Sequence, residues 1–242
     1  MTARQWTIAP LVLATAMRDR SQVLLLGPLG FGVPGVVLAW LLMSGNEKIL
    51  VDTGLGELDT AELKNDFGQS QDQLIEPQLM RFDTAPHDIS LVINTHLHVD
   101  HCRGNGYFKN ARFLVQKREF EYAQNPLPVH RPAYHVDLTG MKFEFLDGDA
   151  QVAPGINVIL TPGHSPGSQA VLVETAEDRY VIAGDTITHY ENMAVPDGDS
   201  FWPGPLYVDL KEFYQSLDRL KNLGGIILPG HDPLVLKRKT YP

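Results

Sequence analysis

The sequence has a single cysteine, Cys102, in 242 residues, so no disulfide can form within the chain. Disulfides are common in oxidising compartments, and their exclusion here favours a reducing, cytoplasmic location. Basic residues are also scarce, with 20 Lys and Arg against 29 Asp and Glu and a formal net charge of −9. Nucleic-acid binding favours a basic face, so the composition argues against a nucleic-acid partner.

Long hydrophobic runs are absent as well. No apolar stretch approaches the roughly 20 residues of a membrane-spanning helix, and we expect no membrane partner. Residues 8–16 follow Arg4 and end in Ala-Thr-Ala, a weak likeness to a secretory signal. Pro10 interrupts this run, and polar residues 18–21 separate it from apolar residues 23–26. The pattern therefore favours two strands joined by a turn over a signal peptide.

The remaining pattern predicts one globular domain, residues 1–242, since 43% hydrophobic content in this length supplies one substantial core. Short apolar runs between turn signals predict strands at residues 36–43, 48–51, 89–94, 113–115, 143–145, 158–160, 170–174, 180–183 and 226–228. Helical spacing is clear over residues 210–223 and weaker at 58–67 and 77–82. Strands followed by helices, twice over, predict an α/β (α+β) sandwich of two mixed β-sheets with helices on the outer faces.

Residues 95–101, THLHVDH, place four side chains able to bind metal within six residues, directly after a predicted strand. Strand alternation would send His96, His98 and Asp100 one way and the apolar residues between them toward the core. His101 breaks that alternation. A mixed cluster of histidine and aspartate suits a divalent cation such as Zn²⁺.

Three more candidate ligands each follow another predicted strand. His164 lies in Thr-Pro-Gly-His, Asp185 in Ala-Gly-Asp-Thr and His231 in Pro-Gly-His-Asp. A glycine precedes each ligand, where the backbone can require an unusual conformation. Seven candidate ligands exceed the four that a closed structural zinc site needs, which favours a catalytic centre.

This pattern resembles the metallo-β-lactamase superfamily, and the resemblance spans nearly the whole chain, including Asp52-Thr53-Gly54. It implies an αββα sandwich with two divalent metal ions at one edge. The implied ligands are His96, His98 and His164 for the first metal, Asp100, His101 and His231 for the second, and Asp185 as the bridge. Zn²⁺ is the preferred ion, while Mn²⁺, Fe²⁺ and Co²⁺ suit the same ligands.

Histidine directly after Asp100 resembles glyoxalase II enzymes, N-acyl homoserine lactone lactonases and phosphodiesterase-like members rather than true β-lactamases. Residues 93–101 and 161–169, Gly184-Asp185-Thr186 and Glu191-Asn192 look most like the lactonases, whose activity implies quorum quenching. One position departs from that family. Its tyrosine three residues after the bridging aspartate is Thr188 here, and we expect Thr188, His189 and Tyr190 to include the substrate contact.

The expected reaction is hydrolysis of a cyclic ester. Two metals sharing Asp185 would lower the pKa of a shared water to roughly 7, and the hydroxide would attack a carbonyl carbon. Asp100 would accept and return a proton. The alternatives are a thioesterase of the glyoxalase II kind, a cyclic-amide hydrolase, a phosphodiesterase and a metal-holding sensor module without turnover. The short segment after His231 argues against the glutathione-binding tail of glyoxalase II, and the acidic charge argues against RNA processing.

Several nearby residues have simpler interpretations. Asp52 is expected either to form a turn or to support a ligand histidine. Cys102 is expected to pack beside the cluster, and Ser165 and Ser168 to form a turn. His130 and His135 are weaker candidates for substrate contact, and Phe201, Trp202 and Tyr207 suit either a pocket wall or the core. The partner is a small molecule, and the sequence leaves a homodimer open.

Overall fold

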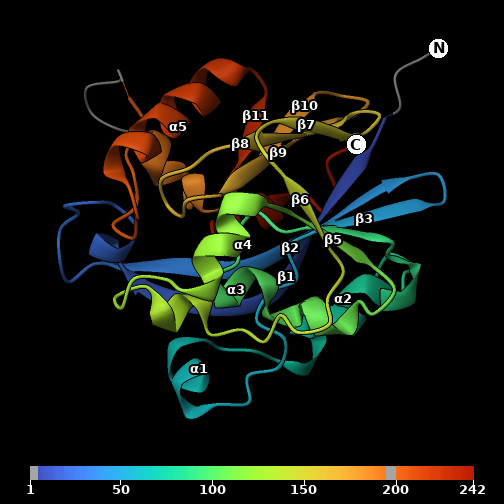
Figure 1. Cartoon of the computed structure of the whole chain (residues 1–242), viewed down its shortest axis with the longest axis horizontal. Helices are drawn as coiled ribbons and strands as arrows, with labels where there is room; N and C mark the ends of the chain where they lie inside the picture. The colour runs from blue at the N-terminus through green and yellow to red at the C-terminus, as the bar shows by residue number, and fades with distance from the viewer. Residues whose placement is uncertain (1–4, 195–199) are drawn as a thin grey trace.

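Two β-sheets face each other, with helices packed on both outer faces (Figure 1). The structure is a computed structural model and describes residues 5–194 and 200–242. It confirms the predicted αββα arrangement. Among the described residues, no helix is both long and apolar enough to cross a membrane.

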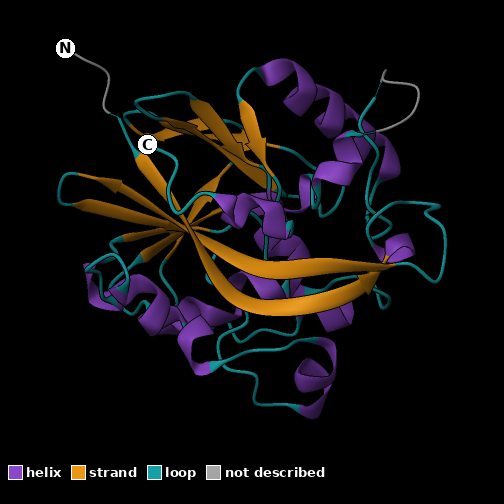
Figure 2. Ribbon diagram, turned by 180° about the vertical axis from the view of Figure 1, so that it is seen from behind, coloured by secondary structure: helices purple, strands orange, loops and turns teal. Residues whose placement is uncertain are grey.

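The first sheet has six strands in the order β1-β2-β3-β4-β5-β6. They are Thr7–Asp19 (β1), Gly32–Ser44 (β2), Glu47–Val51 (β3), Leu91–Ile93 (β4), Arg112–Gln116 (β5) and Phe143–Leu146 (β6). The β1–β2 and β2–β3 pairs are antiparallel, and the pairs from β3 to β6 are parallel. From behind, β1 and β2 form a long curved ribbon (Figure 2).

The second sheet has five strands in the order β11-β10-β9-β8-β7. They are Ala150–Ala153 (β7), Ile156–Leu160 (β8), Gln169–Glu174 (β9), Arg179–Ile182 (β10) and Ile226–Leu228 (β11). Only the β10–β11 pair is parallel. The α-helices are Ala61–Asp66 (α1), Ile75–Met80 (α2), Val99–Cys102 (α3), Lys117–Gln124 (α4) and Leu210–Leu223 (α5). Short 3-10 helices lie at Arg20–Gln22, Gln71–Gln73, Pro86–Asp88, Arg103–Tyr107, Arg131–Tyr134, Gly184–Thr186, Tyr190–Met193 and Pro233–Lys237.

Alternation along the strands divides the apolar residues between two sides of each sheet. Val171 and Val173 of β9 join the core between the sheets, whereas Ala170 and Leu172 pack under α5. The apolar face of α5 covers the second sheet, and its helix begins at the Asp209 side chain, which accepts a hydrogen bond from a backbone N–H. On the other side, α2 packs against the outer face of the first sheet. Burial on both faces explains why β2 is an almost continuous apolar run.

The main departure from the sequence prediction lies at residues 23–26, which form a turn rather than a strand. Leu26 is 88% exposed with a φ of 61°, so this apolar stretch joins no sheet. Instead β1 pairs along its whole length with β2, and both strands are 13 residues long. The helices predicted at 58–67 and 77–82 are shorter or shifted, at α1 and α2. The prediction did not include α3, α4 or β7.

Candidate metal centre

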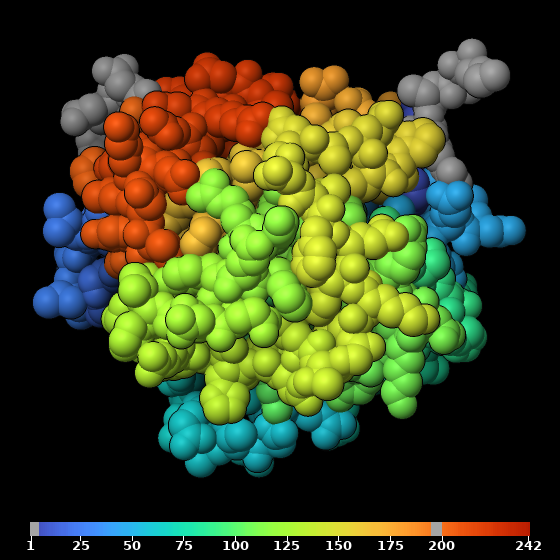
Figure 3. All heavy atoms as spheres, in the orientation of Figure 1, coloured from blue at the N-terminus to red at the C-terminus, as the bar shows by residue number. Residues whose placement is uncertain are grey.

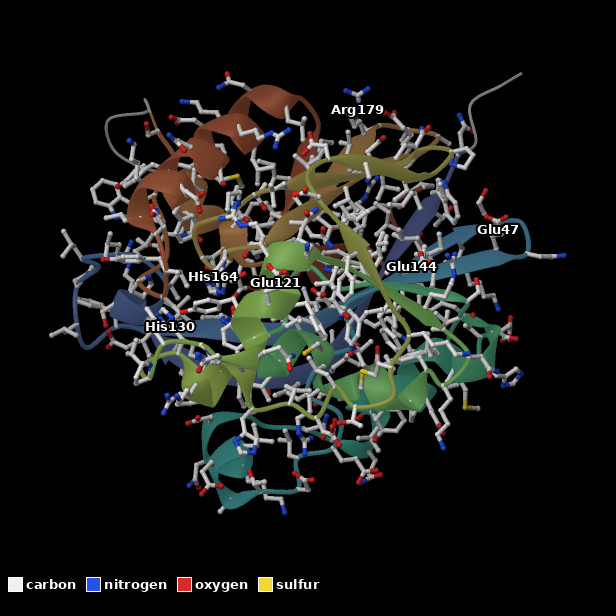
Figure 4. All side chains as sticks on the ribbon, in the orientation of Figure 1. Glu47, Glu121, His130, Glu144, His164 and Arg179 are labelled. Carbon is white, nitrogen blue, oxygen red and sulfur yellow. The ribbon has the colours of Figure 1, made fainter. Side chains whose placement is uncertain are left out.

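All seven predicted ligands converge at one edge of the sandwich. One group comprises His96, His98, His164 and Asp185, and a second comprises Asp100, His101 and His231. Within each group the candidate ligand atoms all lie within 4.8 Å of one another. The four histidines His96, His98, His101 and His164 are each at most 4% exposed. Figure 4 labels His164 and also His130, which lies on the same side of α4 in that view.

The ends of four strands bring these residues together. His96 and His98 lie in the loop after β4, and Asp100 and His101 lie in α3, which follows it directly. His164 follows β8, Asp185 follows β10 and His231 follows β11. The first sheet therefore supplies four of the ligands and the second sheet supplies three.

The glycines before the ligands serve close packing as well as backbone freedom. Gly163 has a φ of 132°, and a Cβ there would lie 2.2 Å from the Cα of Phe213. Gly184 has a φ of 52° and packs against Thr95. Gly230 has no positive φ, but a Cβ would lie 2.6 Å from a neighbouring carbonyl oxygen. Each ligand turn thus needs a residue without a side chain.

Hydrogen-bond acceptors fix the ring orientation of three histidines. The Nδ1 atom of His101 lies 2.8 Å from Asp52 Oδ2, that of His164 lies 2.9 Å from the Leu206 carbonyl, and that of His231 lies 2.8 Å from the Val36 carbonyl. An Nδ1–H that donates to these oxygens leaves Nε2 free to bind a metal. The structure therefore places Asp52 where it can support a ligand histidine. Its carboxylate also accepts from the Thr95 N–H and hydroxyl at 2.7 Å each.

The buried atoms at the centre fit divalent cations. His96 Nε2 and Asp185 Oδ1 are buried and have no hydrogen-bond partner, which is rare for buried polar atoms. His98 Nδ1 lies 3.0 Å from His164 Nε2 in the first group, and His101 Nε2 lies 3.3 Å from His231 Nε2 in the second. Two nitrogens that share a tetrahedral zinc ion at about 2.0–2.1 Å lie about 3.3 Å apart.

Asp185 faces both groups. Its Oδ1 atom lies 3.1 Å from His101 Nε2 and 2.9 Å from His231 Nε2, although neither contact has the geometry of a hydrogen bond. Its Oδ2 atom lies 3.4 Å from His164 Nε2. Each carboxylate oxygen therefore points at a different group, as a bridging ligand requires.

Burial and local charge set the protonation of the cluster. Burial, reinforced by neighbouring histidines, holds the pKa of His96 and His98 well below the usual range. Burial also disfavours the charged form of His101, but nearby carboxylates, led by Asp185, raise its pKa well above the usual range. Burial opposes ionisation of Asp185, yet the surrounding histidines hold its pKa well below the usual range. Neutral imidazoles and ionised carboxylates are the forms that bind metal.

A cavity of about 140 Å³ adjoins the cluster. The lining residues are Ala16, Arg18, Gly35, Val36, Val37, Phe67, Asp100, Asp185, His189 and His231. Of the three predicted substrate contacts, only His189 is among them. Thr188 donates to Asn192 Oδ1 at 3.0 Å, and Tyr190 packs against the core between the sheets. A substrate contact by any of the three stays a prediction.

Other residues singled out in the sequence lie outside this cavity. His130 is buried with its Nδ1 atom 2.7 Å from the Tyr122 hydroxyl, and His135 lines a separate hollow. Cys102 is buried and packs with Leu97, as expected. The hydroxyls of Ser165 and Ser168 lie 2.7 Å apart and close a turn, as expected. Phe201 and Tyr207 pack beside α5, and Trp202 donates to the Leu25 carbonyl.

Glu119 of α4 was not anticipated from the sequence. Its carboxylate is fully buried and accepts four hydrogen bonds: from Leu97 N–H at 3.0 Å, Tyr134 hydroxyl at 3.0 Å, Ser165 hydroxyl at 2.6 Å and Gly167 N–H at 2.9 Å. Leu97 lies between two ligand histidines and Ser165 follows a third. One side chain therefore ties together the two main ligand loops. Only its place three residues after the end of β5 could have drawn attention to it.

Known proteins with similar sequences and structures include N-acyl homoserine lactonases. An N-acyl homoserine lactonase of Bacillus cereus is 35% identical over 159 residues, or 60% of this chain and 61% of that protein. The chain thus matches about 61% of the length of such curated relatives. A structure of a Bacillus thuringiensis AiiA mutant with N-decanoyl-L-homoserine bound at the active site has a TM-score of 0.82 and 29% identity, over 98% of this chain and 96% of that one.

A second structure shows an N-acyl homoserine lactone hydrolase with the product N-hexanoyl-L-homoserine bound at the catalytic metal centre. It has a TM-score of 0.80 and 29% identity, over 98% of this chain and 96% of that one. The family model described as the metallo-beta-lactamase superfamily matches residues 32–231. That match covers most of the chain and all seven candidate ligands, and the chain belongs to the metallo-β-lactamase superfamily.

Proposed function

We propose that this protein is a metal-dependent hydrolase that opens lactones, with N-acyl homoserine lactones as the first substrate class to examine. The observation that carries the proposal is the shared position of Asp185 between two ligand groups, beside a cavity large enough for a small ring. The similar proteins are named for that activity. Breakdown of such lactones would make the protein quorum-quenching.

The ligand set suits two divalent ions, and Zn²⁺ is the metal we propose because histidine nitrogens and aspartate oxygens are among its preferred ligands. Mn²⁺, Fe²⁺ and Co²⁺ fit the same donors. Bound metals would supply a hydrolytic nucleophile at neutral pH and would polarise the carbonyl group. The chain's own residues must then place the ester and move one proton.

Asp100 is the residue proposed to carry that proton. Its side chain lines the cavity, and Oδ2 lies 3.8 Å from His101 Nε2 and 3.7 Å from His231 Nε2. Water adds its oxygen to the carbonyl carbon, and the ring C–O bond breaks. The proton taken up by Asp100 passes to the departing ring oxygen, which becomes a hydroxyl group. The product is a hydroxy acid, which ionises and releases one proton to solvent.

His189 is the residue proposed to contact the substrate in place of the lactonase tyrosine. Its ring lines the cavity, whereas the Thr188 hydroxyl is turned toward Asn192. The Asn192 side chain also accepts from the His189 N–H at 2.8 Å and donates to the carbonyls of Val23 and Trp202. A well-fixed loop therefore presents this ring beside the ligand cluster.

Acid release at constant pH tests the proposal directly. The metal-loaded protein would receive acyl homoserine lactones, other lactones, cyclic amides, a glutathione thioester and a phosphodiester, each with a chelated control. Asp185→Asn should abolish turnover and lower the number of bound metals. His87→Gln is the matched control, because His87 is exposed and outside the cluster.

The outcomes separate the candidate functions. Chelator-sensitive opening of a lactone supports the proposal. Turnover of the thioester, cyclic amide or phosphodiester with inert lactones would assign another hydrolase activity of the same family. Two bound metals without turnover of any compound would favour a metal-holding module. The single domain, the cytoplasmic location and a homodimer stay predictions.

A further inference from the structure

The cavity beside the ligand cluster has a cationic wall that the hydrolytic reaction does not use. Arg18 lies near the end of β1, the strand that pairs with β2 in the long ribbon of Figure 2. It lines the same cavity as Asp100 and Asp185. A lactone whose carbonyl group lies at the ligand cluster would therefore direct its ring substituent toward Arg18 or toward solvent.

The charge on Arg18 is not matched by any carboxylate in the part of the chain that the structure describes. Its neighbour Asp19 accepts from Ser21 and from the Gly30 N–H, and the next residue, Arg20, pairs with Glu191. The guanidinium of Arg18 instead lies over the Phe67 ring, 4.6 Å from its centroid. Stacking on an aromatic face fixes the guanidinium plane and leaves its N–H groups free to donate.

The rest of the wall is apolar and small. Ala16, Gly35, Val36 and Val37 also line the cavity, and none of their side chains can accept from the guanidinium. Ala16 lies two residues before Arg18 in β1, and its β2 partner Gly35 lies beside the His231 carbonyl, so this surface runs from the ligand cluster toward Arg18. A neighbouring hollow shares Ala16, Gly35, Val36 and Phe67 with the cavity and is also lined by Lys64 and Asp66, whose opposite charges leave Arg18 as the unpaired cation among the described residues of this region. A ring substituent with a short aliphatic spacer and a terminal acceptor would fit an apolar wall that ends at Arg18. Carboxylates satisfy a planar guanidinium best, since both oxygens can accept at once.

We propose that Arg18 selects substrates whose ring substituent ends in a carboxylate, so that this site prefers acidic lactones over purely alkyl ones. The inference rests on the proposed lactonase function and specifies its substrate class. The carboxylate would bind Arg18 through two parallel hydrogen bonds, with the lactone carbonyl at the ligand cluster. An uncharged chain of equal length would leave the guanidinium without an acceptor.

The test compares two homoserine lactones with acyl chains of equal length, one ending in a carboxylate and the other in a methyl group. The wild-type protein should show a higher kcat/KM for the carboxylate compound. Charge-assisted pairing at a partly exposed site should give a selectivity ratio of roughly 10, and at most about 100. Arg18→Met should lower this ratio toward or below one, and Arg18→Lys should restore part of it.

Arg81→Met is the matched control. Arg81 also stacks on an aromatic ring, with its guanidinium 5.6 Å from the Phe82 centroid, but it does not line the cavity. Its removal should leave the selectivity ratio as in the wild type. Equal losses for both substrates in Arg18→Met, or a wild-type preference for the methyl compound, would overturn the proposal.

A binding measurement keeps this proposal separate from the lactonase function. Calorimetry with the metal-loaded protein would use the ring-opened hydroxy acids of the same two lactones. Tighter binding of the compound with the additional carboxylate, lost in Arg18→Met, supports the role of Arg18 even if neither lactone is hydrolysed. Equal affinity in the wild type would refute that role even if both lactones are hydrolysed.

Discussion

Glu119 gives the sharpest test of how the ligand loops are held. Glu119→Ala removes the acceptor of four hydrogen bonds from a site with no exposed surface. Each buried donor left without an acceptor costs about 1–3 kcal/mol. Loss of the charge recovers some desolvation energy, and the two hydroxyl donors can turn elsewhere. The net loss in free energy of unfolding should therefore be about 3–5 kcal/mol.

The loops should also bind metal less tightly. Loss of groups that orient ligands typically costs about 10- to 100-fold in metal affinity. Glu119→Gln should disturb the site less, because glutamine keeps the shape of the side chain. Its amide NH₂ would nevertheless face some of the groups that donate to the Glu119 carboxylate. Urea unfolding of the chelated protein measures the free energy of unfolding without any contribution from metal. Competition with a chromophoric chelator measures the metal affinity.

Glu121 of the same helix is the control, labelled in Figure 4. Its side chain is 63% exposed and lies 3.7 Å from Lys117, so Glu121→Gln should change stability by less than about 0.5 kcal/mol. The reasoning is refuted if the free energy of unfolding of Glu119→Ala lies within about 1 kcal/mol of the wild-type value. Equal metal affinity in Glu119→Gln and Glu121→Gln would refute the claim that Glu119 holds the ligand loops in the arrangement that binds metal.

Three further predictions follow from other contacts. Asp52→Asn should weaken metal binding about 10- to 100-fold, because the carboxylate that orients His101 is lost; metal titration of the variant measures this, and unchanged affinity would contradict it. Gly163→Ala should lower the free energy of unfolding by at least about 2 kcal/mol, because its Cβ would lie 2.2 Å from a backbone atom of α5, whereas Gly106→Ala, with nothing within 4 Å, should cost less than about 1 kcal/mol. Stability should fall between pH 10 and 12, because burial raises the pKa of Tyr241 to about 12 from 10.0, so the unfolded chain loses this proton first. Tyr241→Phe should reduce that slope in urea unfolding measured across the pH range, and an unchanged slope would assign it to other groups.

The candidate ligand set could be predicted from the sequence because each ligand or ligand cluster follows a short apolar run, and a glycine precedes His164, Asp185 and His231. Strand ends are where a sheet delivers side chains to one edge, and the local pattern marks them. The turn at residues 23–26 could not be predicted from the sequence. Their composition fits a strand, but whether they join a sheet depends on β2, a competitor that offers β1 a partner of equal length.

Glu119 shows a different limit. Its helix, with neighbours such as Lys117 and Glu121, reads as a polar surface segment, and one buried carboxylate in it has no local signature. Its partners are 15 to 48 residues away in sequence. Arg18 is similar, because its place in the lining of the cavity distinguishes it from Arg20, which pairs with Glu191.

The division of the ligands between the sheets has a consequence for folding. Neither candidate metal group lies within one sheet: His96 and His98 follow a strand of the first sheet and His164 a strand of the second, and Asp100 and His101 are likewise separated from His231. The isolated first half of the chain can offer a cation only a few ligands, so tight binding requires the sheets to have docked. Any ligand that binds only the docked state stabilises it by mass action. A higher metal concentration should therefore shift the equilibrium from separated to associated sheets. The rate of metal uptake during refolding would then report the rate at which the two sheets dock.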